Sequence, residues 1–256
     1  MHRAADYLAS KFPAKVKKVV VQAYVLTAAD AAAVVPRLRQ DANDYYYSAC
    51  ISVIDGLRAV DAGFFTWSTV KFYYSVFYSL RAILAWNGVV VFWPEDSPFH
   101  VAATAGSNPS WASGKGSHKC MANCFRKLLP THFLLRQDIE LMNGIDWLLE
   151  KRESANYRLS RFQEPAVPEH YTRIVGTGVR QAITAYLDPA SILTFDKDHA
   201  IVSFPLAALR VVGDLAKADG GAEFSQDELA FLRRKARERS NALAPLLAFI
   251  VGTLRT

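Results

Sequence analysis

The sequence predicts a mainly α-helical protein, a helical bundle around a central aromatic-rich helix with few or no strands. Three observations lead to this fold class. Apolar residues recur at three-and-four spacing along several long segments, as they do on the buried face of a helix. Helix start and stop signals separate these segments. Hydrophobic residues make up 51% of the 256 residues, which is enough for a substantial core.

The N-terminal part predicts two helices and one extended piece. Residues 4–12 are expected to form a short helix. The β-branched run 19–25 predicts a short strand or a buried extended segment. An Ala-rich stretch leads to Pro36, which either interrupts a helix or begins the next one, because Pro suits a first helical turn. The next helix is predicted over 37–62, with Gly63 as its C-terminal stop.

The clearest predicted element is a helix over residues 66–87. Its apolar residues follow three-and-four spacing, and Phe72, Val76 and Ile83 cover much of the remaining circumference. A helix that is apolar on most sides belongs in the centre of a bundle. We therefore expect this segment to form the core helix, ending at Asn87-Gly88.

The C-terminal half predicts further helices. A long helix is expected over 133–157 and another over 169–187, closed by Asp188-Pro189. A helix over 206–218 is expected to stop at Gly220-Gly221. Ser225 and Glu228 form a capping box that starts a last helix running toward Arg239, which Pro245 then kinks or restarts. A boundary near residue 190 would divide the chain into a bundle of residues 1–190 and a C-terminal helical extension of residues 191–256, or both belong to one domain.

Charge and cysteine content limit the partners and the compartment. The formal net charge is +6, which permits binding to nucleic acid, an anionic membrane or an acidic protein. Three cysteines are too few and odd in number for a disulfide framework, so a reducing compartment is favoured. We see no secretory signal and no uninterrupted apolar run of about 18 residues. The sequence therefore predicts a cytoplasmic protein with no membrane partner.

Familiar ligand and cofactor motifs are absent. The loop 106–117 holds a Gly-Lys-Gly, but Pro109 and Gly116 break the phosphate-loop pattern. It is either a flexible basic loop or one that closes on an anion. His118, Cys120, Cys124 and His132 do not have the spacing of a zinc site, so we expect no metal and no cofactor. Asp138 and Glu140, two residues apart on the predicted helix, are expected to be solvated surface groups.

The strongest site candidate lies near the end of the predicted helix 133–157. Arg152 and Asn156 are four residues apart and share a helix face, with Tyr157 beside them and Arg158 and Arg161 flanking them. These residues are suited to position a phosphate and to assist its transfer to a 2′-hydroxyl. The structural alternative is a helix C-terminus that favours cations through its dipole.

A second cationic run lies near the C-terminus and suggests nucleic-acid binding. Five cations occupy seven residues, and on a helix they fall on two faces. Phosphate contact is the functional interpretation, and a solvated helix face or acid pairing within the bundle is the structural one. The residues are Arg233, Arg234, Lys235, Arg237 and Arg239.

The segment 67–84, Trp-Ser-Thr-Val-Lys-Phe-Tyr-Tyr-Ser-Val-Phe-Tyr-Ser-Leu-Arg-Ala-Ile-Leu, resembles the aromatic core helix of HEPN-type helical bundles and of related bacterial YaaC-like proteins. With the Arg152 segment, the resemblance covers about residues 40–160. In that superfamily the ribonuclease motif is an Arg, four to six residues, and then a His. Here Arg152 is followed after four residues by Tyr157. Arg126 and His132 match literally, but Pro130 between them would break a helix that carries both.

The resemblance implies a catalytically degenerate HEPN-like bundle that dimerises across the motif helices. We expect a non-enzymatic module that binds RNA, DNA or an operon-encoded protein partner in a bacterial phage-defence or toxin-type system. A metal-independent ribonuclease using Arg152, Asn156 and Tyr157 is the first alternative, although tyrosine, with a pKa of about 10, is a poor base at neutral pH. A small-molecule-binding bundle with an aromatic-lined pocket is the second.

Overall fold

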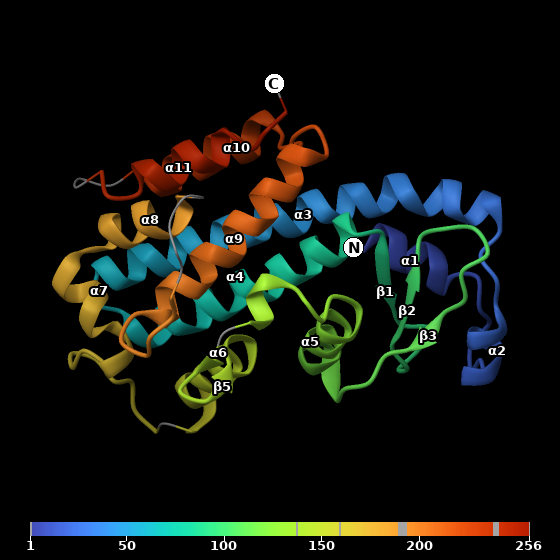
Figure 1. Ribbon diagram of the computed structural model, residues 1–256, viewed down its shortest axis with the longest axis horizontal. Helices are drawn as coiled ribbons and strands as arrows, with labels where there is room; N and C mark the ends of the chain where they lie inside the picture. The colour runs from blue at the N-terminus through green and yellow to red at the C-terminus, as the bar shows by residue number, and fades with distance from the viewer. Residues whose placement is uncertain (1, 137, 159, 189–193, 238–240, 256) are drawn as a thin grey trace. The chain divides into compact units, whose positions relative to one another are not determined.

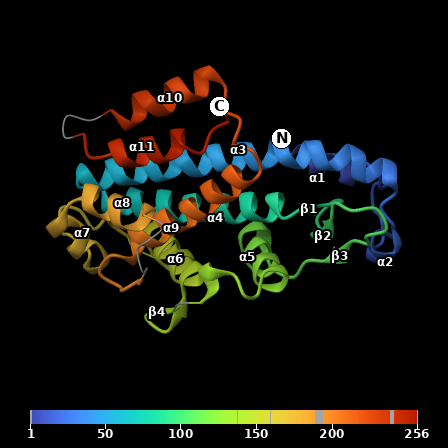
Figure 2. The same ribbon diagram turned by 45° about the horizontal axis from the view of Figure 1, so that its top comes forward.

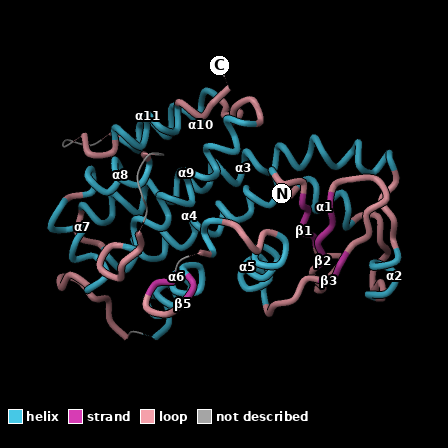
Figure 3. Tube along the Cα trace, in the orientation of Figure 1, coloured by secondary structure: helices cyan, strands magenta, loops and turns pink. Residues whose placement is uncertain are grey.

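The computed structural model describes residues 2–136, 138–158, 160–188, 194–237 and 241–255. The protein is 64% helical, with eleven α-helices and five short strands in this described part (Figures 1 and 3). The predicted mainly α-helical class is therefore confirmed. The chain divides into two compact units, which we call unit 1 (residues 1–45 and 80–130) and unit 2 (residues 46–79 and 131–256).

Unit 1 combines helices with a small sheet. Strands β1, β2 and β3 form an antiparallel sheet in that order, with Val90 opposite Val101 and Phe92 opposite Phe99. Leu8 of α1 and Leu38 of α3 belong to the same buried cluster as Phe92 and Phe99. The elements are α1 (Arg3–Ala9), α2 (Lys18–Ala23), the first half of α3 (Ala28–Asp61), the end of α4 (Phe65–Trp86), β1 (Val89–Phe92), β2 (Phe99–Ala102), β3 (Ser110–Trp111) and α5 (Gly116–Leu128).

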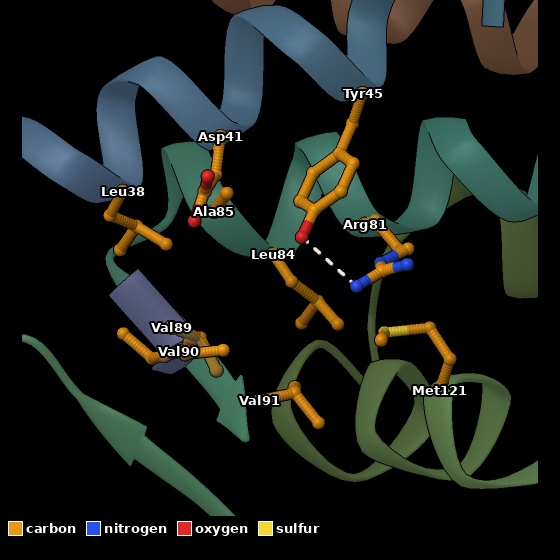
Figure 4. A pocket seen from close by; sticks show the side chains of 11 residues that line it. Leu38, Asp41, Tyr45, Arg81, Leu84, Ala85, Val89, Val90, Val91 and Met121 are labelled. Atoms are coloured by element: carbon orange, nitrogen blue, oxygen red, sulfur yellow. Dashed lines mark hydrogen bonds between the residues drawn. The ribbon is translucent and has the colours of Figure 1, made fainter. Parts of the chain in front are cut away.

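Buried polar groups of α3 fix α1 and α4 within unit 1. The carboxylate of Asp41 accepts hydrogen bonds from the backbone N–H groups of Arg3 and Ala4, both at 2.9 Å, which satisfies the N-terminus of α1. Arg81 of α4 donates to the Tyr45 hydroxyl at 2.9 Å (Figure 4). The pocket drawn around these side chains has a volume of about 20 Å³, which is room for one water molecule and not for an organic ligand.

Unit 2 is almost entirely helical. Within it α10 and α11 lie on one side of α3, and α6 lies on the far side of α4 (Figures 1 and 2). Its elements are the second half of α3, the first part of α4, η1 (Phe133–Leu135), β4 (Asp138–Ile139), β5 (Met142–Asn143), α6 (Gly144–Glu153), η2 (Ser154–Arg158), η3 (Glu169–Tyr171), α7 (Thr172–Thr177), α8 (Val179–Leu187), α9 (Ala200–Ala218), α10 (Gln226–Ala236) and α11 (Ala244–Val251).

The close contact of α3 with α4 organises unit 2. The ring of Phe72 lies directly against the Cα of Gly56, where a Cβ would be only 2.8 Å from the ring. Ser68 of α4 donates to the Gly56 carbonyl at 2.9 Å. Ser75, one turn past Phe72, donates to the Ala49 carbonyl at 3.3 Å. Small residues on both helices thus allow the two backbones to approach, and α4 forms a core helix as predicted.

The prediction for residues 19–25 is wrong, because residues 18–23 form the helix α2. Only Val21 is buried in it, while Val19 and Val20 are exposed. β-Branched residues favour strands where they fit a half-buried pleated surface, and most of this segment is not half-buried. The extended part of this segment begins after it, where Leu26 exchanges backbone hydrogen bonds with Gly106 and Ser107.

Pro36 neither interrupts nor begins a helix. Helix α3 starts eight residues earlier, where Thr27 and Asp30 form a reciprocal cap: the Asp30 N–H donates to the Thr27 hydroxyl and the Thr27 N–H to the Asp30 carboxylate, both at 3.1 Å. Pro36 lies inside the helix, and the side chain of Arg37 donates to the Ala33 carbonyl there at 2.6 Å. The Thr27–Asp30 cap therefore sets the start of α3, and the helix continues through Pro36.

The predicted long helix over 133–157 is also wrong. A short turn, η1, is followed by the β4–β5 hairpin, and α6 begins only at Gly144. Glu140 and Leu141 occupy the hairpin turn with φ of 52° and 65°, as a two-residue turn of this handedness requires. Asn143 then caps α6 by accepting from the Ile145 N–H at 3.1 Å.

Other predicted boundaries are confirmed. At the end of α3 the N–H of Gly63 donates to the Val60 carbonyl and that of Phe64 to the Ala59 carbonyl, the pattern of a glycine-terminated helix. The Ser225 capping box starts α10, and Pro245 in the first turn of α11 restarts the chain as a helix. The predicted helix 169–187 is instead divided into η3, α7 and α8, with Gly178 at φ of 88° between the last two.

The domain boundary near residue 190 stays a prediction, because residues 189–193 lie outside the described part of the chain. The two compact units divide the chain at other positions, and both α3 and α4 contribute to each unit. In the described part of the chain, no helix combines the length and the apolar character that crossing a bilayer requires.

Replacement of Gly56 by alanine tests the α3–α4 contact. The new methyl group would meet the Phe72 ring, so we expect a loss of unfolding free energy of about 1–3 kcal/mol in urea denaturation. Gly176→Ala in α7 is the matched control, because no atom lies within 4 Å of its added Cβ. That control is expected to keep or slightly raise stability. Equal stabilities of Gly56→Ala and the unchanged protein would contradict the close approach.

Candidate functional site

Arg152 lies at the centre of a cluster of tyrosine rings in unit 2. Its guanidinium carbon is 5.7 Å from the ring centroid of Tyr73, 5.9 Å from that of Tyr74 and 5.3 Å from that of Tyr157. One of its terminal nitrogens donates to the Tyr74 hydroxyl at 3.4 Å. Its Nε is buried and has no hydrogen-bond partner among the described residues. A buried donor of this kind is uncommon in folded proteins, so the Arg152 side chain is a candidate for a functional role.

A π-helical turn at the end of α6 brings Tyr157 to Arg152. Residues 154–158 form this turn, in which backbone hydrogen bonds join residues five apart in place of four. Residue 157, five after Arg152, therefore lies over the guanidinium. The predicted pairing of Arg152 with Asn156 on one face of a regular helix is not seen. Among the described residues, Asn156 makes no hydrogen bond to the Arg152 cluster. π-Helical turns occur frequently at functional sites.

The hairpin before α6 and the core behind it position this helix. The indole N–H of Trp147 donates to the Glu140 carboxylate at 2.7 Å, and Lys151 lies 3.2 Å from the same carboxylate. A Cβ at Gly144 would be 2.7 Å from the Phe204 ring of α9, so only glycine permits this approach. Glu140 is exposed, as predicted, but its expected place on a helix is wrong. It is a hairpin residue that holds α6 through two side chains.

A second aromatic pair lies beside the N-terminus of α4. The rings of Trp67 and Phe162 meet edge to face, with centroids 5.9 Å apart. Glu164 fixes this loop, because its carboxylate accepts from the Thr66 N–H at 2.7 Å and from the Thr66 hydroxyl at 2.8 Å. Burial opposes ionisation of Glu164, but these hydrogen bonds prevail and lower its pKa. The ionised carboxylate therefore caps α4 and complements the helix dipole.

The Arg152–tyrosine cluster and the Trp67–Phe162 pair define what we call the aromatic–arginine surface of unit 2. Trp67, Phe162 and Tyr157 are exposed by 50%, 55% and 73%, although such large rings are usually buried. Arg161 is exposed and has no ion pair among the described residues. Arg158 lies 3.5 Å from Glu150 and 3.8 Å from Glu153, pairs on exposed side chains that bind weakly. The surface comprises Trp67, Tyr74, Arg152, Tyr157, Arg158, Arg161 and Phe162.

The C-terminal cations lie only partly as predicted. Helix α10 ends at Ala236, so Arg237 is a cap residue and does not stack on Arg233 as a helical neighbour. Arg233 is exposed, and Arg234 lies over the ring of Phe231 at 5.2 Å. Lys235 is 3.6 Å from Asp55, which also meets Lys71 of α4 at 3.4 Å. Arg239 lies outside the described residues.

A polar pocket of about 230 Å³ lies one turn of α4 before Tyr73. Thr69, Lys151, Gln163 and His170 are among its lining residues. Burial, with a smaller effect of the Lys151 charge, lowers the pKa of His170 to about 4. The His170 Nε2 has no hydrogen-bond partner among the described residues. His170 is therefore neutral near pH 7, and sequence analysis gave no signal for it because it lies outside every motif.

A further polar cluster joins α8 to the start of α9 and has a structural role. Burial raises the pKa of Tyr186, whose hydroxyl donates to the Thr194 carbonyl at 2.6 Å and lies 2.7 Å from His199 Nε2. His199 Nδ1 is 2.6 Å from Asp198. The protonated phenol holds the segment before α9 against α8.

Among the described residues, the remaining motif candidates are not brought together as a site. The cysteines are free and buried, and among the described residues no three His, Cys, Asp or Glu side chains converge as metal ligands would. Helix α5 ends at Leu128, and His132 lies beyond it as the cap of η1, so one helix does not carry both Arg126 and His132. Gly114 makes a tight turn, because a Cβ at this position would be 2.6 Å from the Cys120 backbone nitrogen, and the loop leads straight into α5.

Comparison with protein families, curated proteins and solved structures finds no match for this chain. The resemblance to HEPN-type bundles therefore stays a prediction. The candidate site rests on its own geometry.

Replacement of Glu164 by glutamine tests how the loop is held. Because the folded pKa lies below the usual 4.5, the stabilisation is complete above about pH 4.5 and is lost as the pH falls through the folded pKa. We expect Glu164→Gln to cost about 1 kcal/mol at pH 7 in urea denaturation and less at lower pH. The control Glu169→Gln, whose ion pair with Lys197 is exposed, is expected to cost little. A constant difference at every pH would exclude the charge as the cause.

The pH dependence of stability tests the burial of His170. Its pKa falls from 6.5 to about 4 on folding, so the unfolded chain takes up the proton first. This effect destabilises the folded protein progressively below pH 6.5, by on the order of 3 kcal/mol at pH 4. His170→Gln is expected to lose less stability between pH 7 and pH 4.5 than the unchanged protein. Parallel curves for the two proteins would show that His170 is solvated.

Proposed function

We propose that this chain is a non-enzymatic RNA-binding module that holds a single strand on the aromatic–arginine surface of unit 2. One observation carries the proposal: exposed aromatic rings alternate with arginine side chains over α4, the π-helical turn and the loop that follows it. Rings stack on unpaired bases, and cations track the phosphates between them.

The rings are placed to take bases. Trp67 and Tyr74 lie on the same face of α4, seven residues and thus about 10 Å apart, close to the span of three stacked nucleotides. Phe162 contacts Trp67, and Tyr157 lies on the Arg152 that Tyr74 also binds. The Trp67–Phe162 pair and the Tyr74–Tyr157 rings are therefore spaced along α4 as the stacking positions for successive bases would be.

The cations are placed to take phosphates. Arg152 lies against the rings of Tyr74 and Tyr157, and Arg161 precedes Phe162 in the chain. Arg158 is paired with two exposed carboxylates. Lys71, on the same α4 face, shares Asp55 with Lys235 of α10. Because Lys235 lies near Lys71 through this shared Asp55, we propose that Arg233, Arg234 and Lys235 continue the path of the RNA backbone beyond the rings. A longer RNA strand would then reach them.

The cluster is suited to binding more than to cleavage. The groups around Arg152 are phenols, and burial raises the pKa of Tyr73, so that this group stays protonated. A general base for a 2′-hydroxyl needs a pKa closer to the working pH. The large buried rings of α4, such as Phe72, pack in the core, which speaks against the pocket of α4 rings that the small-molecule alternative needs. An operon-encoded partner and a role in phage defence rest on the resemblance alone.

Gel retardation with labelled single-stranded RNA in EDTA tests the proposal. Each of Trp67→Ala, Tyr157→Ala and Phe162→Ala is expected to weaken binding by about 5- to 100-fold, because stacking contributes roughly 1–3 kcal/mol per base. Arg161→Glu is expected to weaken it more at low salt than at high salt. The control is Val35→Ala in unit 1, an apolar side chain exposed to a similar degree, 52%, that belongs to α3 and lies outside this surface.

Each alternative has its own outcome in the same assay. Retardation unchanged in all three ring variants would overturn the proposed surface. Cleavage products that disappear in Arg152→Ala would show a ribonuclease in place of a binding module. No retardation at all, together with a second protein that co-purifies in equal amount through these rings, would make the surface a protein interface.

A further inference from the structure

A separate exposed surface of unit 1 combines valines, a tryptophan and lysines. We call it the α2 surface, and it is independent of the aromatic–arginine surface. Val19, Val20 and Val25 are exposed by 65%, 52% and 51%, and Trp111 of β3 by 48%. The residues of the α2 surface are Lys15, Lys17, Lys18, Val19, Val20, Val25 and Trp111, and α2 and β3 lie side by side (Figures 1 and 2).

A fixed frame holds these valines outward. Val21 anchors α2 in the core of unit 1, so its neighbours Val19 and Val20 face away from that core. After α2 the chain is tied to the loop before β3, because Leu26 exchanges backbone hydrogen bonds with Gly106 and Ser107 at 2.8 Å and 2.9 Å. The Lys18 ammonium lies over the Trp111 ring at 4.6 Å and joins helix to strand. Their exposure is thus a property of the folded unit.

The charge of this unit is strongly positive. Unit 1 contains 12 Lys and Arg against 6 Asp and Glu, whereas unit 2 contains 18 of each, so the net charge of +6 belongs to unit 1. Among the described residues Lys17 and Lys18 have no ion pair. The acid at this place is Glu95, which accepts from the Lys15 backbone N–H and leaves the Lys15 ammonium unpaired. The lysines of the α2 surface therefore face solvent with their charge uncompensated.

We propose that the α2 surface binds the headgroup and upper acyl region of an anionic lipid bilayer. Lysines attract anionic headgroups, tryptophan prefers the interface, and exposed aliphatic side chains insert just below it. Valine distinguishes this surface from a nucleic-acid site, because an aliphatic side chain offers no face on which a base can stack. Val19 and Val20 are exposed residues of α2, a short helix at one end of the unit (Figure 1), a position that suits a flat bilayer better than a matching protein groove.

Such binding needs no helix that crosses the bilayer. The expectation of no membrane partner rested on the lack of a long apolar run, and interfacial binding depends instead on a local apolar patch with cations around it. The proposal therefore revises that expectation for this surface only.

Sedimentation of the full chain with lipid vesicles tests the proposal. We expect binding to phosphatidylcholine vesicles that contain about one third phosphatidylserine, weaker binding at high salt, and at least tenfold weaker binding to phosphatidylcholine alone. Val19→Gln with Val20→Gln and, separately, Lys17→Glu with Lys18→Glu are each expected to reduce binding about tenfold or more. These side chains are exposed, so both variants are expected to fold, which thermal melting checks.

The matched control changes two exposed valines of unit 2, Val175→Gln with Val251→Gln, and is expected to bind vesicles like the unchanged protein. Equal binding to neutral and anionic vesicles, or full binding by the α2 variants, would overturn the proposal. Loss of RNA retardation in the α2 variants without any vesicle binding would also overturn it and assign the surface to nucleic acid.

Discussion

The contact between Gly56 of α3 and the Phe72 ring of α4 is the constraint on which the rest of unit 2 depends. It brings two helices so close that hydroxyl groups of α4 reach carbonyls of α3. Because the Phe72 face of α4 must point inward, the rotation of the helix about its axis is fixed. The face that carries Trp67, Lys71 and Tyr74 is then the outward one, so the packing of the core decides which aromatic rings meet solvent.

The C-terminal half of the chain uses that fixed helix as its support. Glu164 caps the N-terminus of α4, and the buried Tyr171 hydroxyl meets Thr69 at 3.0 Å one turn further along. Arg152 then meets Tyr73 and Tyr74 on the following turn. Three successive turns of one helix therefore organise three segments that are distant in sequence. Glu164 holds the loop of Phe162 near α4, and Arg152 holds Tyr157 there. The two exposed rings are therefore fixed by contacts of the folded unit.

The parts of the fold that could be predicted are those decided by local chemistry. The apolar spacing of α4, the glycine after α3 and the Ser225 capping box each act within a few residues, and each is found where the sequence places it. The predictions for residues 19–25 and 133–157 are wrong for another reason. Their apolar patterns suit both helix and strand, so contacts with the surrounding fold decide the secondary structure. In the first segment the burial of Val21 decides it, and in the second the turn at Glu140 and Leu141 does. The Thr27–Asp30 cap is a local start signal as well, and it sets the beginning of α3 despite Pro36.

The candidate site shows the same limit at the scale of one turn. Spacing along a regular helix pairs Arg152 with Asn156, whereas the π-helical turn advances the pairing by one residue and brings Tyr157 to the guanidinium. This shift of one residue changes the chemistry of the site, because the Tyr157 ring lies where the Asn156 amide would lie in a regular helix. A ring over an arginine offers stacking and charge together, which is what a base and its phosphate require, and it offers no proton acceptor near neutral pH. The irregular turn is therefore the feature that best supports the proposed binding function at this site.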